Sequence, residues 1–177
     1  IPGGGDGPDA FFAARDQVRF LFYSDDPTSS VAVTEGEHAL SHGQVTRQIV
    51  VNGKSDGSLI GDYPTMALAG LVPALLARDA RSAFVIGLGT GVTAGELGAL
   101  DGMQHVTVAE ISQGVLDAAP LFDGGNRHAS RNPKIELVRG DAYRTLLQSG
   151  ERFDVIASEP SNPWVVGGEL VFSPVFP

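Results

Sequence analysis

Phe84-Val-Ile-Gly-Leu-Gly-Thr-Gly-Val92 is the stretch that decides the fold of this chain. Its apolar first half is typical of a buried parallel strand, and the glycines after it let the backbone turn tightly against a ligand. A helix that begins near Val92 directs its free amide groups toward that ligand. The stretch therefore predicts a strand, a ligand-binding turn and a helix.

Three further apolar runs follow at regular spacing, and each of them ends in a carboxylate: Val106–Glu110, Ile135–Asp141 and Phe153–Glu159. The pattern predicts strands over 84–88, 105–109, 135–138 and 153–157, and helices over 92–100, 112–121 and 142–148. Strands that alternate with helices form right-handed βαβ units and a parallel sheet. We expect an α/β nucleoside-binding domain with a doubly wound, mostly parallel sheet.

The first third of the chain has a different pattern. Three β-like runs, over 18–23, 30–34 and 44–51, are separated by turn-forming clusters, which is typical of a small antiparallel sheet. Asn52-Gly53 is a strong turn signal directly after the third run. We expect a linker over 1–16, a small β-domain over 17–60 and the nucleoside-binding α/β domain over 61–177.

Helical spacing follows from Asp62 to Arg78. Asp62 is a good N-cap residue, and Pro64 fits the first turn of a helix. Pro73 is expected to end or kink this helix, because a proline lacks the amide hydrogen that the helix interior requires.

Composition excludes several functions. The chain has 177 residues, no cysteine and a net charge of −9, so disulfides and thiolate metal sites are absent and a nucleic-acid-binding surface is disfavoured. His38 and His42 have a metal-ligand spacing, but they fall in an expected loop, so we expect no metal. With no membrane-spanning run and no signal-peptide pattern, we expect a cytoplasmic protein.

The run over 153–157 is apolar throughout, and such a strand belongs in the interior of a sheet. The sequence ends soon afterwards, at Pro177, so we expect the C-terminal strands of the sheet to be absent from this chain. An open apolar edge is unfavourable. We therefore expect later strands, a partner chain or the 164–177 segment to cover it.

Two strand-end carboxylates are candidates for nucleoside binding. Glu110 lies 19 residues after Gly91, where an acid can accept hydrogen bonds from both ribose hydroxyls. Asp141 can accept from an adenine amino group or cap the helix that follows it. A dinucleotide site is the alternative, but the acids after the later strands and the short chain argue against it.

Ser158-Glu-Pro-Ser-Asn-Pro-Trp164 is the candidate reaction loop, because ligands of open α/β sheets bind at the carboxyl ends of the strands. Its two prolines restrict its shape, while Glu159 and Asn162 offer a base and an amide. Trp164 can stack on a substrate or anchor the loop in the core.

Taken together, Gly87–Gly91, Glu110, Gly140-Asp141 and Asp154–Pro163 resemble the polyamine aminopropyltransferase (spermidine synthase) family. Upstream, Val51-Asn-Gly-Lys-Ser-Asp56 followed by Asp62 resembles two further signatures of that family. The sequences Asn52-Gly-Lys54 and Ser158-Glu-Pro-Ser-Asn-Pro-Trp164 resemble those of spermidine-synthase-like domains that are fused to multi-span membrane segments.

The resemblance implies a methyltransferase-like sheet and decarboxylated S-adenosylmethionine as donor. A diamine such as putrescine then attacks the methylene beside the sulfonium and releases methylthioadenosine, with Glu159 as base at the position of the family's catalytic Asp. The resemblance further assigns donor binding to Gly87, Gly89, Thr90, Gly91, Glu110, Asp141 and Ser158, and amine binding to Asp62, Asn162 and Trp164. A homodimer is one option for the assembly.

The sequence also departs from the family. Thr90 and Asn162 replace two aspartates, Asp56 replaces a glutamine, and Met66 and Ala67 replace a polar pair. A buried ammonium needs such partners. Two alternatives therefore stay open: a methyltransferase that uses S-adenosylmethionine itself, and a non-catalytic nucleoside-binding module of a larger protein.

Overall fold

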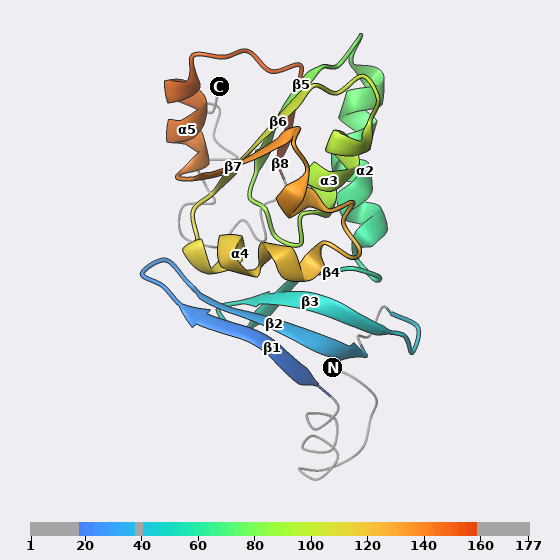
Figure 1. Cartoon of the computed structure of the whole chain (residues 1–177), viewed down its shortest axis with the longest axis vertical. Helices are drawn as coiled ribbons and strands as arrows, with labels where there is room; N and C mark the ends of the chain where they lie inside the picture. Colours follow the sequence, from blue (N-terminus) through green and yellow to red (C-terminus); the bar gives the residue numbers. More distant parts are fainter. Residues whose placement is uncertain (1–17, 38–40, 159–177) are drawn as a thin grey trace.

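The computed structural model describes residues 18–37 and 41–158 of the chain. These residues form two four-stranded sheets, with the strand orders β1-β2-β3-β4 and β7-β6-β5-β8. Figure 1 shows the antiparallel sheet at the bottom, the parallel sheet above it and helix α4 between the two. The described residues therefore contain the small antiparallel sheet and the α/β layer that the sequence predicts.

The antiparallel sheet has one strand more than expected. Its strands are β1 (Arg19–Asp25), β2 (Ser30–Glu37), β3 (Val45–Val51) and β4 (Lys54–Ser58). The β4 sequence has no aliphatic, aromatic or β-branched side chain, so no apolar alternation announces it. It forms because Asn52 and Gly53, with φ of 51° and 80°, make a hairpin turn that pairs Val51 with Lys54.

The parallel sheet confirms the βαβ prediction. Its strands are β5 (Ser82–Ile86), β6 (His105–Glu110), β7 (Ile135–Arg139) and β8 (Val155–Ser158), and all of its pairings are parallel. The β5 strand begins two residues earlier than expected and ends at Ile86. It ends there because Gly87 has a φ of 83°, which is incompatible with extended backbone.

Helices cover both faces of this sheet. On one face, α3 (Val92–Ala99) packs Leu97 into a core that includes Val85 and Val106. On the other face, Leu146 of α5 (Ala142–Ser149) packs beside buried Phe84 and Ile86. Figure 1 shows α5 on the opposite side of the sheet from α2 and α3. The doubly wound arrangement is therefore confirmed.

Helix α2 (Tyr63–Leu76) differs from expectation in that Pro73 does not end it and Asp62 makes another contact, while a kink at Pro73 stays a prediction. Pro73 lies inside the helix and does not end it, since a proline removes only its own amide hydrogen and Ala77 N still donates to Pro73 O at 2.9 Å. Asp62 occupies the N-cap position, but its side chain caps no helix amide. It accepts a hydrogen bond from Ser58 Oγ at 2.8 Å, because β4 ends directly beside it.

Helix α4 (Gln113–Ala118) is shorter than expected and continues as a 3₁₀ turn, η1 (Ala119–Phe122); a second 3₁₀ turn, η2 (Ala129–Arg131), follows. Pro120 in the first turn of η1 favours this break, because it cannot donate a helical hydrogen bond. Gly114 lets α4 approach the antiparallel sheet, since a Cβ there would lie 3.1 Å from Val31 Cβ. The two sheets thus pack against the same helix.

The last described strand, β8, is parallel to β5, as expected for the strand beside the glycine turn. It is not buried on both faces: Val155 and Ala157 are buried, whereas Ile156 is 42% exposed. The β8 strand begins at Val155 rather than at residue 153, because the Asp154 carboxylate accepts from Arg81 N and Ser82 N at the start of β5. That the far edge of β8 is covered stays a prediction.

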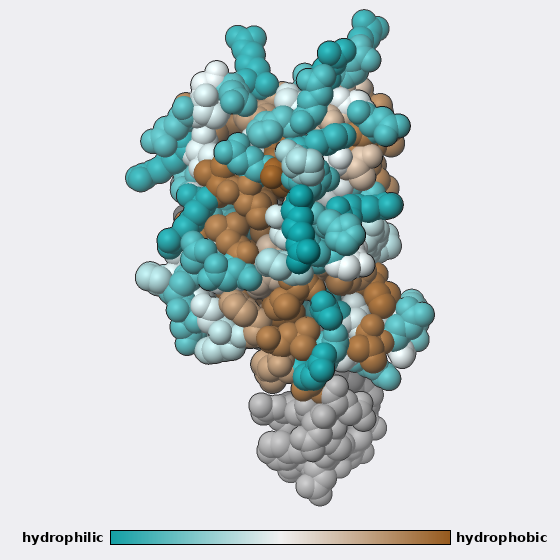
Figure 2. All heavy atoms as spheres, in the orientation of Figure 1, coloured by the Kyte–Doolittle hydropathy of each residue, from teal (hydrophilic) through white to brown (hydrophobic). Residues whose placement is uncertain are grey.

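The surface mixes polar and apolar side chains, and Figure 2 shows brown patches among hydrophilic residues on the face drawn in Figure 1. Exposed apolar side chains on α2 include Leu68, Val72, Leu75 and Leu76. Among the described residues, no helix is long and apolar enough to span a membrane.

Helix α3 packs so closely on the loop between η1 and η2 that Gly95 has no room for a side chain. A Cβ at this position would lie 1.9 Å from the carbonyl oxygen of Asn126. Gly95→Ala is therefore expected to lower the free energy of unfolding by about 2 kcal/mol or more, although alanine favours a helix by about 1 kcal/mol.

Urea unfolding followed by circular dichroism measures this loss. Gly124→Ala is the matched control, because a Cβ there meets nothing within 4 Å. Equal unfolding midpoints for the two variants would contradict the packing of α3 on Asn126.

Candidate functional site

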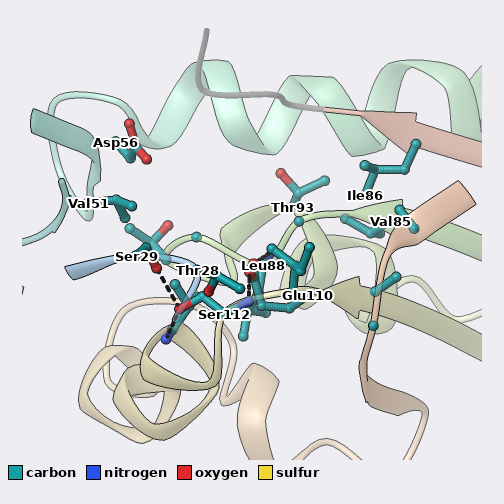
Figure 3. A pocket seen from close by; sticks show the side chains of 18 of the residues that line it. Thr28, Ser29, Val51, Asp56, Val85, Ile86, Leu88, Thr93, Glu110 and Ser112 are labelled. Atoms are coloured by element: carbon teal, nitrogen blue, oxygen red, sulfur yellow. Dashed lines mark hydrogen bonds between the residues drawn. The ribbon is translucent and has the colours of Figure 1, made fainter. Parts of the chain in front are cut away.

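A cavity of about 400 Å³ opens where the carboxyl ends of β5, β6 and β7 meet the antiparallel sheet. Figure 3 shows Glu110 and Ser112 beside Thr28 and Ser29 from the β1–β2 turn, with Val51 and Asp56 at one end. The α/β layer lines it with Gly87, Gly89, Thr90, Glu110, Asp141 and their neighbours. The site is therefore built by both sheets.

The glycine loop turns from β5 into α3 through left-handed backbone. Gly87, Gly89 and Gly91 have φ of 83°, 52° and 76°, a region that residues with a side chain rarely adopt. A Cβ at Gly87 or Gly89 would meet nothing within 4 Å, so these two glycines are required by conformation rather than by crowding. Gly91 is the N-cap of α3 and donates its amide to Leu88 O at 2.8 Å.

Asn126 holds the glycine loop in place by hydrogen bonds, a role that the sequence did not predict. Its side-chain amide donates to Thr90 O at 2.8 Å, while its Oδ1 accepts from Ala129 N at 3.0 Å. Asn126 is 2% exposed, so these bonds are shielded from water. The only sequence signal is the Gly124-Gly-Asn cluster, which marks a turn but does not indicate which loop it contacts.

Glu110 ends β6 inside the cavity with 8% of its surface exposed. Its Oε2 accepts from Leu88 N at 2.9 Å and its Oε1 accepts from Ser112 N at 2.8 Å. Each carboxylate oxygen has a second lone pair. Glu110 therefore holds the glycine loop and can still accept hydrogen bonds from a ligand.

Burial raises the pKa of Glu110 above its ordinary value, because removal from water disfavours the charged form. The amides of Ser112 and Leu88 oppose this shift of the pKa, and the charge of Asp26 adds to it. A ligand that donates hydrogen bonds to this carboxylate stabilises the ionised form, so ligand binding and ionisation of Glu110 are coupled.

Asp141 follows β7 and lines the same cavity. Its Oδ1 accepts from Arg144 N at 2.9 Å, which confirms the predicted N-cap of α5. The second carboxylate oxygen remains available for the exocyclic amine of a base. The N-cap and the ligand roles are therefore compatible.

A short network joins the β1–β2 turn to α4 at the rim of the site. The Asp26 carboxylate accepts from Ser112 Oγ at 2.8 Å and from Gly114 N at 3.0 Å, and Ser29 Oγ donates to Ser112 Oγ at 2.9 Å. The hydrogen bond from the Thr28 hydroxyl lowers the pKa of Asp26 most, and those from Gly114 N and Ser112 Oγ lower it further. The sequence predicted a turn here and a helix that begins near Ser112, but not the contact between them.

The other predicted site residues lie in different places. Asp62 accepts a hydrogen bond from Ser58, and Ser158 ends β8, where it pairs with Ile86. Neither Asp62 nor Ser158 is among the described residues that line the cavity. The candidate base and amine contacts, Glu159, Asn162 and Trp164, lie outside the described residues, as does His38. Within residues 18–37 and 41–158, no cluster of acidic or histidine side chains could hold a metal.

The family model for the spermine/spermidine synthase domain matches residues 64–176. The chain belongs to this family. Similar curated proteins are polyamine aminopropyltransferases of Serratia proteamaculans and Pseudomonas aeruginosa, which are 31% and 33% identical over 106 residues. A polyamine aminopropyltransferase of Thermococcus kodakarensis is 34% identical over 111 residues. Each match covers 59% of this chain and 37–38% of the relative.

Solved structures support the same fold. A spermidine synthase in complex with the transition-state analogue AdoDATO superposes with a TM-score of 0.72 at 18% identity, covering 83% of this chain and 48% of that one. Spermidine synthase from Thermotoga maritima gives 0.70 at 19% identity, covering 82% and 48%. The chain thus spans less than half the length of these proteins.

The bond between Asn126 and Thr90 generates a prediction. Asn126→Ala leaves the Thr90 carbonyl and the Ala129 amide without their partner, and each buried unsatisfied group costs about 1–3 kcal/mol. We expect an unfolding free energy lower by about 2–4 kcal/mol, measured by urea denaturation.

Asn132→Ala is the control, because Asn132 makes one local hydrogen bond to Lys134 N at a partly exposed position. If Asn126→Ala lowers the free energy of unfolding no more than Asn132→Ala does, the glycine loop does not depend on Asn126.

Proposed function

We propose that this protein is an aminopropyltransferase, which transfers an aminopropyl group from decarboxylated S-adenosylmethionine to a small amine such as putrescine. The observation that carries the proposal is the cavity after β5, β6 and β7, where Glu110 and Asp141 end successive strands beside a left-handed glycine loop. Membership of the spermine/spermidine synthase family and the names of the relatives support it.

The donor's nucleoside fits the described residues. Glu110 accepts hydrogen bonds from the ribose hydroxyls, Asp141 accepts from the adenine amine, and the loop at Gly87, Gly89 and Thr90 lies against the sugar. The carboxylate of Glu110 is already oriented by two backbone amides. Little ordering is then required of this side chain when the nucleoside binds.

The chemical step needs a deprotonated amine. Its nitrogen lone pair attacks the methylene carbon beside the sulfonium, the carbon–sulfur bond breaks, and methylthioadenosine leaves with the bonding electrons on sulfur. The proton of the amine passes to a carboxylate. We assign this role to Glu159, with Ser158 beside the donor and with Asp62, Asn162 and Trp164 toward the amine.

The remaining parts of the proposal concern the whole protein. We propose that it acts in the cytoplasm on small molecules rather than on nucleic acid, requires no metal and forms a homodimer. The β-domain over 17–60 and the nucleoside-binding domain over 61–177 then form the two walls of one site, and 1–16 is a linker.

The reaction itself is testable. Incubation of the protein with decarboxylated S-adenosylmethionine and putrescine is expected to release methylthioadenosine, measured by chromatography; parallel incubation with S-adenosylmethionine tests methyl transfer. Glu159→Gln should lower turnover by at least 100-fold, as loss of a general base does, and leave methylthioadenosine affinity nearly unchanged. Equal loss of turnover and affinity would assign Glu159 a structural role.

The raised pKa of Glu110 predicts a pH dependence of nucleoside binding. Ionised Glu110 accepts from both ribose hydroxyls, so the affinity for methylthioadenosine should fall as the pH falls through a value above the ordinary 4.5. The effect on folding has the opposite sign. Because the pKa of Glu110 is higher in the folded than in the unfolded protein, Glu110 stabilises the fold at low pH. This contribution is lost as the pH rises from the ordinary pKa of 4.5 through the folded pKa.

Calorimetric titration with methylthioadenosine between pH 4.5 and 7 measures the affinity. Glu110→Gln should bind about 10-fold or more weakly at pH 7 and lose the pH dependence, whereas Glu151→Gln at an exposed position should keep it. A pH dependence that survives in Glu110→Gln would refute this assignment.

A further inference from the structure

The cavity has a second acidic end, on the wall that the antiparallel sheet contributes. Asp56 of β4 lines the cavity beside Val51, and its side chain is 17% exposed. Figure 3 places Asp56 at the end of the cavity away from Val85 and Ile86. The nucleoside-binding carboxylates, Glu110 and Asp141, lie on the other wall.

Strand β4 reaches the glycine loop at this point. A Cβ on Gly57 would lie 3.3 Å from Met66 Sδ and 3.5 Å from Thr90 Cγ2, so the residue after Asp56 lies close to α2 and to the glycine loop. Thr90 itself is 2% exposed and directs its hydroxyl to Met66 Sδ at 3.2 Å. The loop therefore presents no charge here, and Asp56 supplies the one carboxylate that the antiparallel sheet contributes to the described cavity lining.

The charges around the cavity have one sign. Among the described residues, its lining contains three carboxylates, Asp56, Glu110 and Asp141, and no lysine, arginine or histidine. Lys54 Nζ lies 4.0 Å from Asp56 Oδ1, but that side chain is 56% exposed and does not line the cavity. A one-signed cavity with low-dielectric walls favours a cationic ligand.

We infer that Asp56 binds the ammonium group at the aminopropyl end of the donor and thereby selects a donor without a carboxylate. This inference rests on the proposed function. With the adenosine held by Glu110 and Asp141, the chain beyond the sulfur extends toward the other end of the cavity. A terminal ammonium is attracted to Asp56, whereas the carboxylate of S-adenosylmethionine itself is repelled by it.

The test compares three ligands by calorimetry: methylthioadenosine, which lacks the ammonium, decarboxylated S-adenosylmethionine, and S-adenosylmethionine. Asp56→Asn should weaken binding of the decarboxylated donor by about 10- to 100-fold, the loss expected for a charge-assisted hydrogen bond. Its affinity for methylthioadenosine should stay within about 2-fold, and the preference over S-adenosylmethionine should shrink.

Two further variants separate charge from folding. Asp56→Glu keeps the charge and should retain the preference for the decarboxylated donor. Asp101→Asn makes the same change in net charge at an exposed turn before β6, at the opposite end of the parallel sheet, and should change none of the three affinities.

The outcomes distinguish this inference from the proposed function. Equal weakening of all three ligands in Asp56→Asn, or no weakening of any, would overturn the assignment of Asp56 alone. Failure of the unaltered protein to bind methylthioadenosine would overturn the proposed function and this inference with it.

Discussion

The left-handed backbone at Gly87, Gly89 and Gly91 is the constraint on which the rest of the site depends. It ends β5 at Ile86, reverses the chain and starts α3 at Val92. Side chains at these positions would strain the backbone even where space is free. The loop is then held from two sides, by Glu110 through the Leu88 amide and by Asn126 through the Thr90 carbonyl.

Glu110 is buried and holds the glycine loop, which affects its electrostatics. Loss of hydration raises its pKa, and the amides of Leu88 and Ser112 compensate for part of that cost. The same two bonds fix the orientation of the carboxylate. A ribose that donates to its remaining lone pairs would complete the hydrogen bonding of a group that the protein leaves only partly satisfied.

The antiparallel sheet is part of the site and not a separate appendage. Asp26 accepts hydrogen bonds from Ser112 and Gly114 at the start of α4, and Gly57 lies close to Thr90 of the glycine loop. These contacts set the distance between the two walls of the cavity. They also explain how a residue far away in sequence, Asp56, can complement a loop that carries Thr90.

Local sequence patterns determined much of this protein. The structure confirms the apolar runs, the glycine turn, the Asn52-Gly53 turn and the N-cap at Asp141, and each of these depends on neighbours within a few residues. Glu110 and Asp141 could be placed at one edge of the sheet because parallel strands end together.

Other features were decided only by the tertiary structure. The β4 strand has no apolar pattern and forms by pairing with β3. Helix α2 continues past Pro73 because the amides after it still donate to helix carbonyls, as Ala77 N does to Pro73 O. Asn126 and Asp26 bond to residues 36 and 88 positions away, and Asp56 lines the cavity together with residues of the other sheet. Such contacts follow from packing two sheets around α4, and no pattern along the chain encodes which surfaces will meet.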